Sequence, residues 1–158
     1  MQTVAKKTVE MLREKNLTVA AAESCTGGLV SAKITSVSGS SAVISFSMTT
    51  YSNEVKIAKL GVSRKTIEEF GAVSEQTARE MAENVRTMAD ADIGVSVTGV
   101  AGPSTSEGKA VGTVFIGIST KEKTTVEQLK EPPLTRDEIR EKAAERALEM
   151  VLETAKTY

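Results

Sequence analysis

One feature constrains the fold of this chain more than any other: a short apolar run is followed by a turn with two glycines and then by a helical pattern. The run LTVAAA (residues 17–22) has the length and composition of a short buried strand. In the segment LVSAKITSV (residues 29–37), Leu29, Ala32 and Ile34 follow the apolar spacing of a helix. A strand, a glycine turn and a helix in succession are half of a βαβ unit, which favours an α/β fold.

Further helices and strands alternate along the chain. Residues 4–12 carry the apolar stripe of an amphipathic helix. Residues 42–49 alternate apolar side chains with Ser and Thr in the period of a half-buried strand, although the first turn of that segment could be helical. Ser74 is the expected N-cap of a helix whose inner stripe consists of Ala78, Met81, Ala82, Val85 and Met88. The segment DIGVSV (residues 92–97) then predicts another strand.

The C-terminal third predicts a hairpin followed by a closing helix. Residues 110–119 and 124–131 have the pattern of two strands joined by the charged turn TKEK. Thr135 and Glu138 have the spacing of a capping box at the start of the closing helix. Together the elements predict a single domain over residues 1–158, built as a three-layer α/β/α sandwich around a mixed sheet.

The composition narrows the possible partners and the compartment. With 158 residues, 26% of them charged and a net charge of −1, the chain offers no basic surface for nucleic acid or for an anionic membrane. No segment reaches the ~18 apolar residues of a membrane span, and the N-terminus lacks the apolar core of a signal peptide. The single cysteine excludes an internal disulfide. We therefore expect a cytoplasmic protein without a metal site or a cofactor.

The sequence contains no histidine, which limits the chemistry that an active site could use. Catalytic Ser-His and Cys-His pairs are excluded, and the usual general base is missing. Proton transfer in an enzyme of this composition would fall to Lys, Tyr, Asp, Glu or Cys.

The first candidate site is the turn between the first strand and its helix. Thr26, Gly27 and Gly28 precede the helix, where free backbone N–H groups and the helix dipole would suit a phosphate or a carboxylate. A tight turn in which Ser24 or Thr26 caps the helix is an equally simple interpretation. The stretch matches neither the P-loop nor the dinucleotide fingerprint. Cys25 has no histidine partner and is expected to be a small buried apolar residue.

The second candidate site is TGVAGP (residues 98–103), which follows a strand. In α/β folds, ligands bind at the carboxyl ends of the strands. Thr98 and Gly99 could therefore share a cleft with the first turn, although a plain Gly-Pro loop has the same composition.

The third candidate site is the segment GSSAVISFSMTTYSNEVK (residues 39–56). A serine activated by Lys or Tyr is one of the few nucleophiles open to a chain without histidine, and Ser41, Tyr51 and Lys56 supply these groups. A cap, a strand end and a solvated helix face are the simpler interpretations of these residues. Ten extended residues would also separate Ser41 from Tyr51 by ~33 Å, so they share a site only if the chain coils or turns back.

The last candidates are Arg136 and Arg140 in the first turns of the closing helix. Either guanidinium could reach a phosphate, whereas a surface charge beside Asp137 and Glu138 is the default interpretation.

Taken in order, seven motifs resemble the CinA C-terminal domain family over about residues 12–152: AESCTGG, GSSAV, YSNEVK, LGV, GAVSEQTAREMA, TGVAGP and VGTVFI. Members of this family include nicotinamide-nucleotide amidases, which convert nicotinamide mononucleotide to nicotinate mononucleotide and ammonia. The loop GPSTSEGKAVGT departs from the GPDGG that is common in relatives, and SFSMTTYSNE lacks glycines that relatives often place before the Tyr.

The resemblance implies a metal-independent amidase with a pyridine-nucleotide substrate that forms a homodimer or a higher homo-oligomer. By matching position, the nucleophile would be Ser41, with Tyr51 and Lys56 as its proton-transfer partners. The substrate-binding residues would be Ser24, Thr26, Gly27, Gly28, Thr98, Gly99 and Arg140. Two alternatives stay open: a nucleotide-binding or regulatory module that has lost turnover, and an amidase for another small carboxamide.

Overall fold

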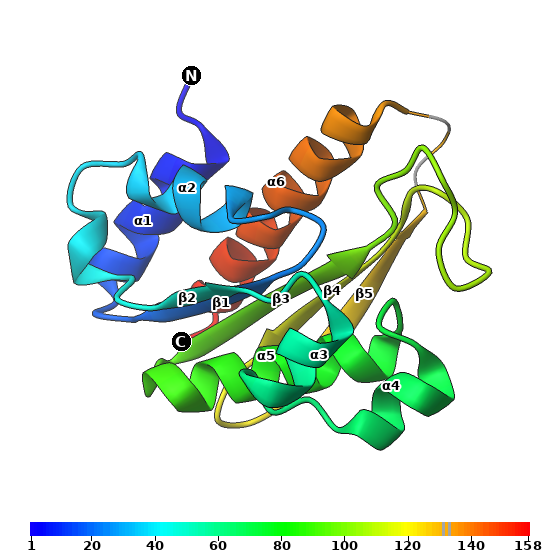
Figure 1. Ribbon diagram of the computed structural model, residues 1–158. Helices are drawn as coiled ribbons and strands as arrows, with labels where there is room; N and C mark the ends of the chain where they lie inside the picture. The colour runs from blue at the N-terminus through cyan, green and yellow to red at the C-terminus, as the bar shows by residue number, and fades with distance from the viewer. Residues whose placement is uncertain (131, 133) are drawn as a thin grey trace.

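A computed structural model describes residues 1–158 with the exception of residues 131 and 133. Within these residues, five strands form one mixed sheet in the order β2-β1-β3-β4-β5 (Figure 1). The strands are β1 (Val19–Glu23), β2 (Ser47–Thr49), β3 (Ile93–Gly99), β4 (Thr113–Ser119) and β5 (Thr124–Lys130). β1 pairs in parallel with both β2 and β3, whereas β4 and β5 form the predicted antiparallel hairpin.

Helices cover both faces of the sheet. On one face lie α1 (Val4–Glu14), α2 (Leu29–Thr35) and α6 (Arg136–Ala155); on the other lie α3 (Asn53–Ala58), α4 (Arg64–Phe70) and α5 (Glu75–Ala89) (Figure 1). The predicted three-layer α/β/α sandwich around a mixed sheet is therefore confirmed.

The first strand shows why its sequence is apolar without alternation. All five residues of β1 are buried, because a central parallel strand is covered on both faces. Val19 and Ala21 pack into the core beneath α1, α2 and α6, whereas Ala20 and Ala22 pack into the smaller core that includes Met81 of α5. Small side chains on this strand let both helical layers lie close to the sheet.

The predicted helix caps are present. Ser74 accepts a hydrogen bond from the backbone N–H of Thr77 at the start of α5. Thr135 and Glu138 form a capping box at the start of α6, which satisfies two of the N–H groups that a helix leaves unpaired at its first turn. Met88 is 50% exposed and lies outside the inner stripe of α5 that was predicted to include it.

Three local predictions differ from the structure. Only Ser47–Thr49 of the predicted strand over residues 42–49 is extended, because the segment starts as a 3-10 turn (Ser40–Ala42) and pairs briefly at the sheet edge. α2 buries Val30 and Ile34 and packs Leu29 against the core, whereas Ala32 of the predicted stripe is exposed. The helix α4 was not predicted from the sequence. Residue 131, the last of the predicted final strand, lies outside the described residues.

The parallel pairing of β1 with β3 determines where their following loops meet. Glu23, the last residue of β1, is in register with Val97, two residues before the end of β3. Ser24 and Thr98 therefore follow at the same edge of the sheet. Among the described residues, no helix is both long and apolar enough to cross a membrane.

Candidate active site

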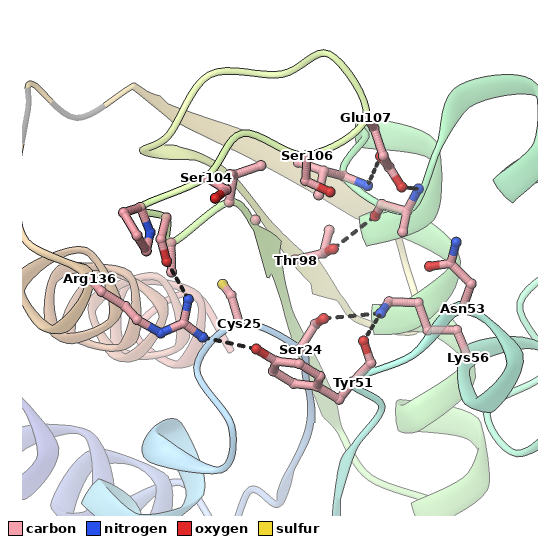
Figure 2. A pocket seen from close by; sticks show the side chains of 17 residues that line it. Ser24, Cys25, Tyr51, Asn53, Lys56, Thr98, Ser104, Ser106, Glu107 and Arg136 are labelled. Carbon is pink, nitrogen blue, oxygen red and sulfur yellow. Dashed lines mark hydrogen bonds between the residues drawn. The ribbon is translucent and has the colours of Figure 1, made fainter.

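A cleft of about 330 Å³ lies at the carboxyl ends of β1 and β3 (Figure 2). Its walls come from the turn after β1, the segment from Tyr51 into α3, the residues before α5, the long loop after β3, and the start of α6. The lining residues are Ser24, Cys25, Tyr51, Asn53, Lys56, Ala72, Val73, Thr98, Gly99, Val100, Ala101, Gly102, Pro103, Ser104, Ser106, Glu107 and Arg136. The structure thus brings the loops ESCTGG and TGVAGP together around one cavity.

A lysine and a serine contact one another inside this cleft. The side chain of Lys56 is 1% exposed, and its Nζ atom lies 3.0 Å from Oγ of Ser24. Nζ also donates to the backbone carbonyls of Thr50 at 2.8 Å and Tyr51 at 3.4 Å (Figure 2). The amine is therefore held in place by groups on two segments and aimed at a serine hydroxyl.

Local structure explains how both side chains reach this position. Ser24 directly follows β1, and its backbone N–H donates to the carbonyl of Val97 on β3 at 3.0 Å. Ser52 caps α3 by accepting from the N–H of Val55, so Lys56 projects from the first turns of a helix that starts at the mouth of the cleft. Because β1 and β2 are parallel, the segment after β2 arrives at the same sheet edge as Ser24.

Burial changes the protonation of this amine. Loss of solvent lowers the pKa of Lys56 to about 8, against a weaker opposing influence of the Glu107 carboxylate. A substantial fraction of the amine is therefore neutral near physiological pH, and a neutral amine can accept a proton from the hydroxyl that it contacts.

The mouth of the cleft is spanned by an arginine and a tyrosine. Arg136 donates from Nη2 to the hydroxyl of Tyr51 at 2.9 Å and from Nη1 to the carbonyl of Gly102 at 2.5 Å (Figure 2). Tyr51 is 61% exposed, so its ring is open to a ligand. A fixed cation at the entrance suits a ligand that carries an anionic group at one end.

Thr98 and Gly99 form part of the inner wall. The hydroxyl of Thr98 donates to the carbonyl of Ala72 at 2.8 Å, which joins the end of β3 to the residues before α5. A Cβ atom at Gly99 would lie 2.7 Å from a methyl group of Val114, so a side chain would not fit there. Both residues therefore line the cleft with groups that are fixed by the sheet and by the segment before α5.

The structure does not bring Ser41 to the cleft. Ser41 is exposed on the 3-10 turn, two residues before Val43, whose carbonyl accepts from the N–H of Val19 at the start of β1. Ser24 lies beyond the opposite end of that strand, and a five-residue strand is about 16 Å long. The chain does coil before β2, which shortens the distance between Ser41 and Tyr51. The coil lies at the end of the sheet opposite the cleft, however, so Ser41 does not contact Tyr51 or Lys56.

Thr26, Gly27 and Gly28 also lie outside the cleft lining. The first N–H groups of α2 are taken by the chain's own Glu23, whose carboxylate accepts from Val30 at 2.9 Å and from Ser31 at 3.1 Å. The side chain of Glu23 is 1% exposed. The helix terminus does hold an anion, but that anion is an internal carboxylate and not a ligand.

The two arginines of α6 have different surroundings. Arg140 donates to the backbone carbonyls of Cys25 at 3.0 Å and Thr26 at 3.2 Å, so it braces the turn after β1 from behind. Arg136 lines the cleft, and Arg140 does not. Arg136 is therefore the better placed of the two for a ligand's anionic group.

Cys25 points into the cleft beside Ser24 (Figure 2). Burial raises the pKa of its thiol to about 11, which keeps the sulfur protonated and a poor nucleophile near neutral pH. Among the described residues, no three His, Cys, Asp or Glu side chains gather in a way that could hold a metal ion.

Sequence reasoning missed several lining residues. Asn53 belongs to the third candidate segment and lines the cleft, whereas the loop after β3 was not expected to contribute beyond residue 103. Ser104, Ser106 and Glu107 belong to a loop without periodicity, and no spacing rule places their side chains.

The fold and the cleft define a class of protein: an α/β sandwich with a buried serine–lysine contact in a pocket at the carboxyl ends of its parallel strands. Residues 1–155 match the model of the CinA C-terminal domain, and the chain belongs to this family. It is 48% identical to the CinA-like protein of Kosmotoga olearia over 145 residues, which are 90% of this chain and 35% of that protein. The chain spans about a third of the length of the curated relatives that it matches.

Crystal structures of related proteins have the same fold. The competence/damage inducible protein CihA from Agrobacterium tumefaciens has 37% sequence identity and a TM-score of 0.91, with 95% of this chain and 92% of that chain covered. The CinA superfamily protein KP700603 from Klebsiella pneumoniae has 26% identity and a TM-score of 0.94, with 98% and 97% covered.

Proposed function

We propose that this protein is an amidohydrolase that converts nicotinamide mononucleotide to nicotinate mononucleotide and ammonia. The observation that carries the proposal is the 3.0 Å contact between Nζ of the buried Lys56 and Oγ of Ser24 inside the cleft. Hydrolysis of an aromatic carboxamide needs an activated nucleophile, and this pair supplies one without histidine. Family membership supports the same chemistry.

In this proposal Ser24 takes the role of nucleophile that Ser41 was predicted to have. Oγ of Ser24 attacks the carboxamide carbon while its proton passes to the neutral amine of Lys56. The tetrahedral intermediate then collapses: the C–N bond breaks, the Lys56 ammonium returns the proton to the leaving nitrogen, and ammonia departs. Water attacks the resulting ester while the amine again accepts a proton. The bond between the acyl carbon and Oγ then breaks, and the Lys56 ammonium returns its proton to Oγ, which releases the carboxylate and restores Ser24.

The rest of the cleft suits a mononucleotide. A volume of about 330 Å³ is at the lower end of the range of small-molecule sites. Arg136 at the mouth would bind the phosphate, and the exposed ring of Tyr51 beside it would contact the ligand. With the carboxamide at Ser24, the phosphate would therefore face the entrance. We also propose that the protein acts in the cytoplasm as a homodimer or a higher homo-oligomer.

A panel of carboxamides scored for ammonia tests this function. The protein is incubated in chelator with nicotinamide mononucleotide, the phosphate-free riboside, free nicotinamide and unrelated small carboxamides. The proposal predicts ammonia chiefly from the mononucleotide, with no requirement for added metal. Ammonia from other carboxamides alone would point to a different amidase, and mononucleotide binding without ammonia would point to a regulatory module.

A further inference from the structure

A glutamate from the loop after β3 is fixed in the wall of the cleft. The carboxylate of Glu107 accepts hydrogen bonds from the backbone N–H groups of Ala72 at 2.9 Å and Val73 at 3.1 Å (Figure 2). Partial burial raises the pKa of this carboxyl, but the two N–H donors and Lys109 outweigh that effect, so the pKa lies below its usual value. Glu107 is therefore a permanent anion near neutral pH.

A lysine from the same loop partly balances this charge. Nζ of Lys109 lies 3.5 Å from the carboxylate of Glu107 and donates to the backbone carbonyls of Phe70, at 2.9 Å, and Val73. Glu107 and Lys109 together fasten the loop to the segment before α5. Either side chain, if removed, would weaken the same attachment.

The charged and titratable groups that line the cleft around Lys56 are few. Among the described lining residues they are Cys25 from the turn after β1, Tyr51 from the segment before α3, Glu107 from the loop after β3 and Arg136 from α6. The thiol of Cys25, with its pKa raised to about 11 by burial, is neutral where Lys56 titrates. Arg136 is a cation bonded to Tyr51. Glu107 is thus the carboxylate among the described residues that line this cleft with Lys56, and its side chain lies on the same side of the view as Lys56 and Asn53 (Figure 2).

We propose that Glu107 is a positioning residue whose carboxylate acts as the counter-charge of the Lys56 ammonium and thereby sets the pH range in which Lys56 can take the proton of Ser24. The inference rests on the proposed function. An anion stabilises a nearby ammonium, so Glu107 offsets part of the effect of burial on the amine. Without it, the amine would lose its proton at lower pH and would become a weaker base.

Two variants separate this electrostatic role from a purely structural one. Glu107→Gln removes the anion and is expected to shift the midpoint of the acid limb of kcat/KM to lower pH by about half a unit. Lys109→Met removes the balancing cation, strengthens the field of Glu107 and is expected to shift the midpoint to higher pH. If the pair only fastened the loop, both variants would change KM in the same direction and leave the midpoint in place.

A direct titration keeps the test independent of turnover. The Cε resonance of Lys56 in the 13C-lysine-labelled protein, assigned by its loss in Lys56→Met, reports the protonation of the amine whether or not ammonia is released. The expected result is opposite shifts of its midpoint in the two variants, with no shift in Glu10→Gln, which removes an equal charge from the surface of α1. An unchanged midpoint in Glu107→Gln, or shifts of the same sign in both variants, would overturn the inference. Absence of ammonia from the wild type would contradict only the proposed function.

Discussion

The Nζ atom of Lys56 lies 3.0 Å from Oγ of Ser24, although 32 residues separate the two in the chain. Parallel pairing of β1 with β2 produces this contact, because the residues that follow both strands emerge at one edge of the sheet. A buried amine of lowered pKa can then do what histidine does in other hydrolases. The absence of histidine is therefore no obstacle to hydrolytic chemistry in this chain.

The first prediction concerns pH. The amine must be neutral to accept the Ser24 proton, and the pKa of Lys56 is lowered to about 8 by burial. kcat/KM should therefore rise about tenfold per pH unit well below pH 8 and level off above it. Initial rates of ammonia release between pH 5.5 and 9.5 measure this profile, and a rate independent of pH over that range would argue against Lys56 as the base.

The second prediction concerns the identity of the base. Lys56→Arg keeps a cation and hydrogen-bond donors in the cleft but cannot lose its proton near neutral pH. We expect kcat to fall by about 10²- to 10⁴-fold, the usual contribution of a general base. The circular dichroism spectrum and the substrate affinity are measured alongside as controls. Activity close to that of the wild type would show that Lys56 serves only as a positive charge.

The third prediction concerns Glu23, whose carboxylate is enclosed at the start of α2. Glu23→Gln keeps the shape but weakens two charge-assisted hydrogen bonds from backbone N–H groups, so the free energy of unfolding should fall by about 1–3 kcal/mol. Urea denaturation measures this change. Ser31→Ala, which removes one hydroxyl donor at 2.8 Å, is the matched variant and should cost less. A ligand-binding role for this helix terminus would instead raise KM in Glu23→Gln without a loss of stability.

The fourth prediction separates the two arginines of α6. Arg136→Ala should raise KM for the mononucleotide at least tenfold and leave KM for the phosphate-free riboside nearly unchanged, because only the phosphate meets this cation. Arg140→Ala should lower the Tm, since the carbonyls of Cys25 and Thr26 lose their donors. Equal effects of Arg136→Ala on both substrates would contradict the placement of the phosphate at the mouth.

The three layers of the fold could be predicted from the sequence because the apolar spacing within each long helix or strand is enough to identify it. The capping box of Thr135 and Glu138 depends on a spacing of three residues and can be read directly. The same holds for β1, whose apolar run reflects cover on both faces. The short edge strand β2 could not be bounded in this way, because only three of its residues pair with β1.

The site was predicted in part, and its limits have a physical reason. Lys56, Tyr51, Ser24 and Thr98 were named from the sequence and lie in one cleft. That Ser24 lines the cleft and Ser41 does not could not be predicted, because it required the direction of β2 and the length of the turn before it. Glu23 shows a second limit. A helix terminus that could bind an anion can be predicted from the sequence, but the sequence does not show that the Glu23 carboxylate itself accepts the hydrogen bonds of that terminus.

The central claim is that Ser24, activated by Lys56, attacks the substrate, and the ammonia released from nicotinamide mononucleotide by two serine variants tests it most directly. Ser24→Ala and Ser41→Ala remove the same atom at opposite ends of β1, so each is the control for the other. The account predicts that Ser41→Ala stays within about twofold of the wild type and that Ser24→Ala, folded and still able to bind the mononucleotide, is slower by at least ~10³-fold. Retention of wild-type activity by Ser24→Ala, or its loss in a stably folded Ser41→Ala, would contradict the account.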